Sequence, residues 1–92
     1  KFELVQNYPN PFNPSTTIKF TLPVESRVTI SVYNLLGELV ETLVNRIEQP
    51  GYFEVEWNAS NLSSGMYIYS MQTKEVATGN ELRSIKKMVL MK

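Results

Sequence analysis

The side chains best suited to chemistry in this sequence of 92 residues are serine hydroxyls, and their usual partners are missing. Ser15, Ser26 and Ser64 are candidate nucleophiles. A serine attacks well only when a neighbouring base, most often an imidazole, accepts its proton. The chain contains no His, and it contains no Cys that would supply a thiolate instead. We therefore expect a protein that is not an enzyme.

Metal ligands are scarce for a related reason. Thiolates and imidazoles are the usual ligands of zinc, and neither occurs in this chain. All nine acidic residues are Glu, whereas calcium loops use Asp at their first positions. We expect no metal and no other cofactor.

Charge and hydropathy exclude two further classes of partner. Nine basic residues balance nine acidic ones, so no broad positive field favours nucleic acid or an anionic membrane. No apolar run approaches the roughly 18 residues that predict a membrane-spanning helix. The basic residues do gather near the C-terminus, where Arg83, Lys86, Lys87 and Lys92 are opposed only by Glu81.

The length of the chain suits a single domain with one modest core, covering residues 1–92. Because the sequence begins with Lys1 and carries no signal peptide, we expect a piece from the C-terminal end of a larger protein. Its first few residues then link the domain to the upstream part of that protein. Without Cys, the fold depends on its core and not on disulfide bonds.

Alternating apolar and polar residues predict β-strands over much of the chain. The alternation is clear in residues 18–22, 28–33 and 53–58, and less regular in residues 66–73 and 85–92. A further short strand is expected near the N-terminus, at residues 2–5. Gly, Pro and Asn separate these runs, and such spacing is typical of an antiparallel β-sandwich. The side chains expected to face the core are Ile18, Phe20, Leu22, Val28, Ile30, Val32, Phe53, Val55, Trp57, Tyr67, Tyr69, Met71, Met88 and Leu90.

Residues 35–47 are ambiguous between helix and strand. Their apolar side chains recur at helical spacing, which taken alone predicts an amphipathic helix. Gly37 opposes this, because glycine costs about 1 kcal/mol relative to Ala inside a helix. A lone helix among strands would also need a sheet face to cover. The pattern leaves both structures open. The apolar residues in question are Leu35, Leu36, Leu39, Val40, Leu43, Val44 and Ile47.

The stretch "QNYPNPFNPSTTIKFTLP" is unusually rich in Asn-Pro junctions. Residues 11–14 form a PxxP pattern, which is a weak match to a polyproline ligand. Proline drives the preceding residue out of the helical region, and Asn side chains cap turns. We therefore expect this segment to run over one end of the sandwich, with Tyr8 and Phe12 packed against the core.

Two features are compatible with sugar contact. Residues 58–60 and 61–63 are glycosylation sequons, although such triplets are common in Asn- and Ser-rich turns. Several aromatic side chains could form a stacking platform, but Trp57 shares its strand face with apolar residues and is expected in the core. That leaves Tyr33 and Tyr52 as the tyrosines expected to be exposed. The candidate platform residues are Trp57, Tyr33, Tyr52, Tyr67 and Tyr69.

Five segments together closely resemble the type A C-terminal sorting domain of the type IX secretion system. They are "LVQNYPNPFNPSTTIKFTLP", "VTISVYNLLGELVETLV", "GYFEVEW", "SGMYIYSM" and "KKMVLMK", and they run from about Leu4 to Lys92. The residues that match the motifs of this family are Asn10 and Pro11 in the opening, Tyr33, Asn34 and Gly37 in a Tyr-Asn-x-x-Gly turn, Gly65 and Tyr67 in a Gly-x-Tyr element, and Lys86, Lys87 and Lys92 in the basic, apolar end.

The resemblance implies an immunoglobulin-like antiparallel β-sandwich of about seven strands, which favours a strand over residues 38–47. It implies a non-catalytic sorting signal that folds in the periplasm of a gram-negative bacterium. This signal directs an attached passenger across the outer membrane, to be secreted or held at the cell surface. The implied partners are the type IX secretion machinery and a sortase-like surface peptidase. Two loops depart from the family pattern: residues 74–80 are longer, and Asn58-Ala59 replaces a frequent Asp-Gly turn.

Two other classes of protein are compatible with the pattern. The immunoglobulin-like domain of the flagellar hook-capping protein shares the Gly-x-Tyr-x-Tyr element and the tryptophan strand, and it would make this chain a scaffold module. A carbohydrate-binding or adhesive module of a secreted hydrolase would present a flat strip of exposed tyrosines. The Asn-Pro-rich opening and the basic, apolar end favour the sorting domain.

Overall fold

The computed structural model describes residues 1–92 and is built from strands, turns and loops. It contains no helix long and apolar enough to cross a membrane. The seven strands are β1 (Glu3–Leu4), β2 (Ser15–Leu22), β3 (Ser26–Tyr33), β4 (Leu39–Glu48), β5 (Gly51–Asn58), β6 (Gly65–Glu75) and β7 (Glu81–Leu90).

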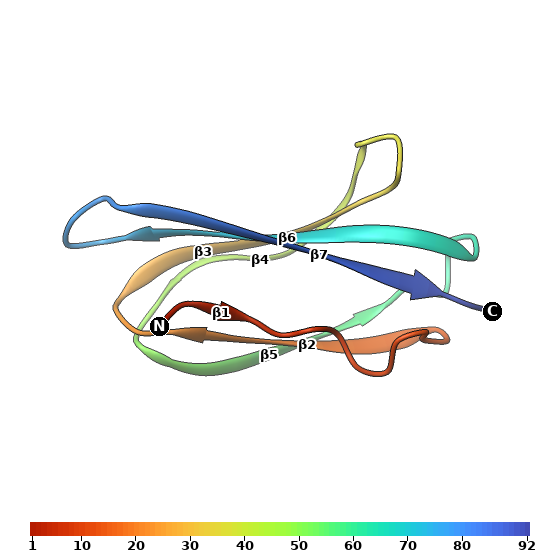
Figure 1. Cartoon of the computed structure of the whole chain (residues 1–92), viewed down its shortest axis with the longest axis horizontal. Helices are drawn as coiled ribbons and strands as arrows, with labels where there is room; N and C mark the ends of the chain where they lie inside the picture. The colour runs from red at the N-terminus through yellow and green to blue at the C-terminus, as the bar shows by residue number, and fades with distance from the viewer.

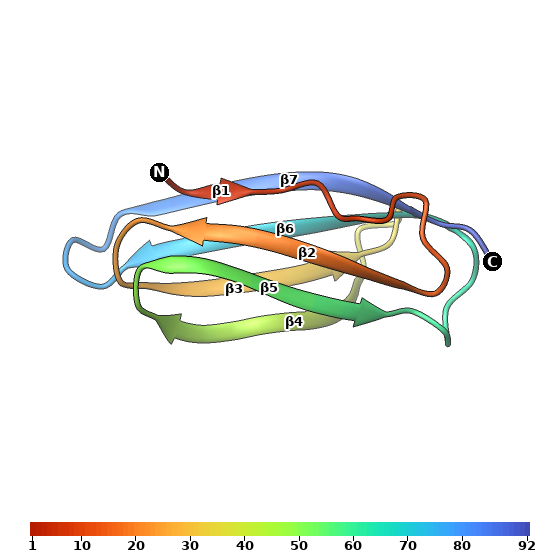
Figure 2. The same ribbon diagram turned by 90° about the horizontal axis from the view of Figure 1, so that it is seen from below.

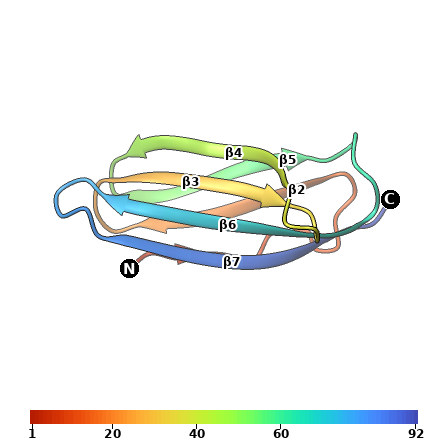
Figure 3. The same cartoon turned by 90° about the horizontal axis from the view of Figure 1, so that it is seen from above.

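The strands form two antiparallel sheets that pack face to face (Figure 1). The smaller sheet has the order β1-β2-β5 and lies nearest the viewer in Figure 2. The larger sheet has the order β4-β3-β6-β7 and lies nearest the viewer in Figure 3. The sandwich is elongated, with extents of 42 × 24 × 17 Å. This confirms the expected immunoglobulin-like architecture, including the short strand near the N-terminus.

A single hydrophobic core of 16 buried side chains lies between the sheets. Nearly all of the side chains expected to face inward are buried, because their strands keep the period of two that a half-covered sheet imposes. Phe53 and Val55 are the exceptions: they are half-buried and pack against the edge of the core. Phe53 still stacks on Phe20 of the neighbouring strand, with ring centroids 5.3 Å apart.

Residues 39–48 form strand β4, so the helical alternative for residues 35–47 is wrong. Two register shifts interrupt the pairing of β4 with β3, and each leaves one extra residue in β4, at Val40 and Leu43. Such bulges break the alternation of a strand and move apolar residues to spacings that imitate a helix. Val44 is the only apolar residue of this stretch that is fully buried. The exposed ones are Leu35, Leu36, Leu39 and Ile47.

Candidate functional site

Three of the four predicted motifs meet around the last strand, toward the end of the sandwich that carries the C-terminus (Figure 1). Within the larger sheet, Gly65 lies opposite Leu90 and Tyr67 lies opposite Met88. From the other side of β7, Phe12 of the Asn-Pro segment forms a parallel bridge with Leu90. The fourth motif, the turn at Gly37, lies apart between β3 and β4.

The Asn-Pro segment is hydrogen-bonded to the end of the chain. The Phe12 N–H donates to the Val89 carbonyl and the Met91 N–H donates to the Phe12 carbonyl, both at 2.9 Å. The side-chain oxygen Oδ1 of Asn10 accepts from the Val89 N–H at 2.9 Å. We call residues 10–12 and 89–91 the latch. It covers the end of an edge strand whose backbone groups would otherwise be unpaired.

The prolines of this segment occupy positions where no backbone donor is needed. Both backbone groups of Phe12 point to β7, so the nitrogen of the preceding Pro11 faces away from the strand. Proline is tolerated at such edge positions because no strand there requires a hydrogen bond from its nitrogen. The peptide bonds before Pro9, Pro11 and Pro14 are cis. The backbone of this segment is paired to the edge of the larger sheet at Phe12 alone, which leaves Pro11 free of the ladder.

A buried polar network supports the latch from within. The Tyr69 hydroxyl donates to the Val5 carbonyl at 2.9 Å and accepts from the Asn7 N–H at 2.8 Å. The Asn7 amide donates to Thr16 Oγ1 at 2.9 Å. Burial raises the pKa of Tyr69 to about 12, although the hydrogen bond from Asn7 opposes this shift. Tyr69 thus joins β6 of the larger sheet to the N-terminal segment.

Sequence reasoning missed Asn7 and Thr16 as members of this network. The sequence did indicate that Thr16 is buried, because it lies an even number of residues from Ile18 and Phe20 and so faces the same side of the strand. A polar residue at an inward position requires a partner. Nothing in the sequence identified Asn7 as that partner.

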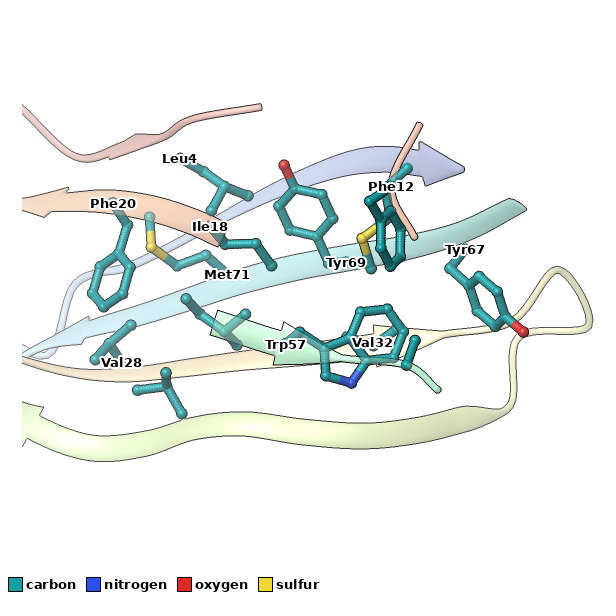
Figure 4. Close-up of a cluster of buried hydrophobic side chains, with 14 of the residues drawn as sticks. Leu4, Phe12, Ile18, Phe20, Val28, Val32, Trp57, Tyr67, Tyr69 and Met71 are labelled. Carbon is teal, nitrogen blue, oxygen red and sulfur yellow. The ribbon is translucent and has the colours of Figure 1, made fainter. Parts of the chain in front are cut away.

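An aromatic cluster fills the core beneath the latch (Figure 4). The Trp57 ring lies 5.8 Å from that of Phe12 and 5.9 Å from that of Tyr67, measured between centroids. The polar tips of the rings are also paired. Trp57 Nε1–H donates to Glu41 Oε1 at 3.0 Å, and the Tyr67 hydroxyl donates to the Ser63 carbonyl at 2.8 Å. The predicted core position of Trp57 is confirmed. Tyr67 is also buried, so it packs within the core and is not accessible to a partner.

The three lysines of the basic, apolar end differ in their surroundings. Lys87 is exposed on the outer face of β7. Lys86 lies opposite the buried Tyr69, so its side chain starts from the inner face, and it is half-buried. Lys92 is tied to the loop before β6: its N–H donates to Ser64 Oγ at 3.0 Å, and its ammonium donates to the Ser60 carbonyl. Lys87 is therefore the lysine that is free to meet a partner.

The turn around Gly37 has a fixed shape. Asn34 Oδ1 accepts from the Leu36 N–H at 2.9 Å and from the Glu38 N–H at 3.0 Å. Gly37 has a φ of +83°, in the left-handed region that favours glycine, and its N–H donates to the Asn34 carbonyl at 3.0 Å. The loop between β3 and β4 rises on the outer side of the larger sheet (Figure 1), and its two turn residues are Leu35 and Leu36.

Two predictions about aromatic side chains are wrong. Phe12 packs against the core as expected, but Tyr8 is 81% exposed. Because the neighbouring Asn7 points inward to the polar network, Tyr8 points outward, and its backbone pairs with Thr17. Tyr33, which the pattern predicts to be exposed, is half-buried, and the alternative of an aromatic platform gains no support. Of its members only Tyr52 is exposed, Tyr33 is half-buried, and the remaining three lie in the core.

Two of the three candidate serines have structural partners. The Ser26 hydroxyl is buried and donates to the Val24 carbonyl at 2.9 Å, while Ser64 Oγ accepts from Lys92. No group of three or more acidic side chains lies close enough together to hold a metal ion.

The fold and its latch define an immunoglobulin-like β-sandwich whose N-terminal segment and last strand are fastened to each other. The chain belongs to the family of secretion system C-terminal sorting domains, whose model matches residues 6–90. This confirms the resemblance found in the motifs. The function of the chain is that of a C-terminal sorting signal for type IX secretion, which sends proteins to the cell surface or outside.

Two solved structures are similar in fold. Part of the dimeric latent PorU from Porphyromonas gingivalis has a TM-score of 0.76 and 21% identity; the match covers 99% of this chain and 9% of PorU. CopC from Methylosinus trichosporium OB3b has a TM-score of 0.62 and 17% identity, with coverage of 98% of this chain and 93% of CopC. At these identities the likeness concerns the fold alone. No curated protein matches the sequence.

Proposed function

We propose that this chain is a single, non-catalytic domain at the C-terminal end of a larger protein, and that it delivers an upstream passenger across the outer membrane. The observation that carries the proposal is the family match over residues 6–90, which takes in most of the latch and all of β7. The domain passes through the periplasm of a gram-negative bacterium and is engaged there by the type IX machinery. A sortase-like peptidase then removes it from the passenger at the surface.

The residues that we assign to recognition have two kinds of role. Pro11 and Lys87 are exposed and contact the machinery directly, next to Asn10. The others position them. Gly65 and Tyr67 hold β6 against β7, and Lys92 holds the end of the chain to the preceding loop. The remaining assigned residues are Gly37, which shapes its turn, and Lys86, which is half-buried beside the core.

Removal of "KKMVLMK" is a poor test of this proposal. It would delete Met88 and Leu90 from the core and Val89 from the latch. It would also expose the edge of β6, which invites aggregation. A loss of export in that variant would follow from unfolding alone.

A better test uses a fusion of the domain to a fluorescent reporter and changes one exposed lysine of the domain. In a bacterium with the secretion system, the wild-type fusion reaches the surface, and Lys87→Ala accumulates in the periplasm. Lys86→Ala with Lys87→Ala is the stronger variant. Lys19→Ala is the matched control, because Lys19 is exposed on the outer face of the smaller sheet, away from β7. Exposed substitutions of this kind change stability by no more than about 0.5 kcal/mol.

The outcome is interpreted only for variants whose purified domains melt within a few degrees of wild type. A wild-type fusion that stays in the periplasm would overturn the proposed function. Normal export of the folded Lys87→Ala variant would instead remove this lysine from the recognition surface and leave Pro11 as the exposed candidate.

A further inference from the structure

We propose that the outer face of the larger sheet, where the Gly37 turn overhangs β6, is a docking surface for a protein of the secretion machinery. The partner that fits has an apolar side chain or ridge bordered by carboxylates. The proposal rests on the proposed function and names the surface through which it operates.

The first observation is the exposure of two leucines at a rigid position. Leu35 is 65% exposed and Leu36 is 84% exposed. Asn34 fixes the backbone of this turn through hydrogen bonds to the N–H groups of Leu36 and Glu38. A rigid turn that holds apolar side chains in water loses little conformational freedom when a partner covers them, which favours binding.

The second observation is a hollow beside the turn. It has a volume of about 330 Å³ and is lined by Tyr33, Leu35, Ile68, Arg83 and Ile85 among others. Figure 3 shows how it arises, because the turn after β3 bends over β6. The hollow is thus open, mostly apolar and bordered by one guanidinium.

The third observation is the distribution of charge. By strand register, the outer face of the larger sheet carries four basic side chains and one acidic side chain. The outer face of the smaller sheet carries one basic and three acidic side chains. The zero net charge therefore conceals two faces of opposite sign. The basic side chains of the larger sheet are Arg27, Lys74, Arg83 and Lys87, against Glu81; the acidic ones of the smaller sheet are Glu3, Glu54 and Glu56, against Lys19.

Charge complementarity selects a protein partner with carboxylates near its apolar contact. A second copy of the chain could set its acidic sheet on the basic one. That contact joins two different surfaces, so it does not form a two-fold dimer and would continue into a ring or an open chain. The partner is therefore a different protein.

The experiment compares export of the reporter fusion for variants of this face and of other faces. Leu35→Ser with Leu36→Ser, and separately Arg83→Glu with Lys87→Glu, are each expected to lower the surface-exposed fraction at least tenfold. Tyr52→Ser with Val5→Ser is the matched control, because both side chains are large, apolar and exposed but line a hollow on the smaller sheet. The control is expected to be exported as wild type. Thermal melting of each purified domain confirms that it is folded.

Site-specific photo-crosslinking identifies the occupant. A photoreactive residue at position 36 is expected to give a discrete adduct with a protein in cells whose translocon is intact, and none in cells that lack it. The same residue at position 52 is expected to give no such adduct. Adducts of the domain with itself, or binding of the purified domain to phosphatidylglycerol vesicles that the Leu35→Ser, Leu36→Ser variant loses, would overturn the assignment. Normal export of both face variants would do so as well.

The two proposals fail in different ways. If the wild-type fusion is not exported, the proposed function is wrong. If wild type, control and both face variants are exported alike, the domain is a sorting signal but this face is not its docking surface.

Discussion

Asn10 and Val89 are 79 positions apart in the sequence, yet the side-chain oxygen of Asn10 accepts a 2.9 Å hydrogen bond from the backbone N–H of Val89. The asparagine side chain does here what the carbonyl of a neighbouring strand does elsewhere along a sheet. Two backbone hydrogen bonds at Phe12 continue the same pairing. The beginning and the end of the sorting domain are thereby parts of one structure.

Replacing Asn10 by Ala should weaken the latch without disturbing the core. The lost hydrogen bond is worth about 0.5–1.5 kcal/mol, which for a domain of this size lowers the melting temperature by roughly 4–8 °C per kcal/mol. Hydrogen exchange at the Val89 amide should accelerate more than exchange at core amides. Asn10→Asp retains an acceptor oxygen and should behave like wild type. Equal protection of Val89 in the Ala and Asp variants would show that the side chain contributes nothing.

Trp57→Ala should be the most damaging of these substitutions. The side chain is 2% exposed and packs between Phe12 and Tyr67. Its truncation should cost about 3–5 kcal/mol, a large part of the net stability of a small domain. Chemical denaturation measures the loss. A variant that unfolds within a few tenths of a molar denaturant of wild type would show that the ring is not part of the core.

Tyr69 should make the domain sensitive to alkali. Burial raises the pKa of its hydroxyl to about 12, whereas an unfolded tyrosine titrates near pH 10. The folded state therefore keeps a proton that the unfolded state loses. The stability linked to this group is fully present below about pH 10 and declines until about pH 12. Each unit of pKa difference is worth about 1.4 kcal/mol.

Tyr69→Phe separates this effect from the titration of other groups. The variant should be less stable than wild type at neutral pH by about 1–3 kcal/mol, because the Asn7 N–H and the Val5 carbonyl lose their partner. The difference between the two proteins should shrink between pH 10 and pH 12. Parallel pH profiles of unfolding free energy for the two proteins would contradict the assignment.

Gly37→Ala tests the turn. No atom lies within 4 Å of the added methyl group, so any cost comes from the backbone and not from a clash. A left-handed φ costs an L-residue roughly 1–2 kcal/mol. Gly37→Asn should cost less, since Asn is enriched in this region. Urea unfolding of the two variants gives the comparison. Equal stability of Ala and Gly at this position would mean that the turn relaxes to another shape.

The strands with one covered face were predictable from sequence, and the contacts between distant segments were not. β2 and β3 alternate strictly, because each inward residue enters the same core. β4 does not alternate, because the bulges at Val40 and Leu43 change its phase, and only the family resemblance favoured a strand there. Bulges have no local sequence signal strong enough to outweigh seven apolar residues at helical spacing.

The family motifs were identified by resemblance, but their meeting at β7 was not. Asn10 contacts Val89 and Gln6 contacts Lys87 across about 80 intervening residues, and no local pattern encodes such pairs. The outward direction of Tyr8 also depends on contacts between distant segments. It depends on Asn7 pointing inward, toward Thr16 and the hydroxyl of Tyr69 from a distant strand.

The parallel run of residues 10–12 beside β7 also has a mechanical consequence. The N-terminal segment and the last strand run in the same direction along the long axis, so tension applied between the two ends of the chain pulls them past each other (Figure 1). The three hydrogen bonds of the latch are then loaded in shear and must break together, not one after another. A domain drawn through a pore by its C-terminus would for that reason resist unravelling at the very place where its two ends are joined.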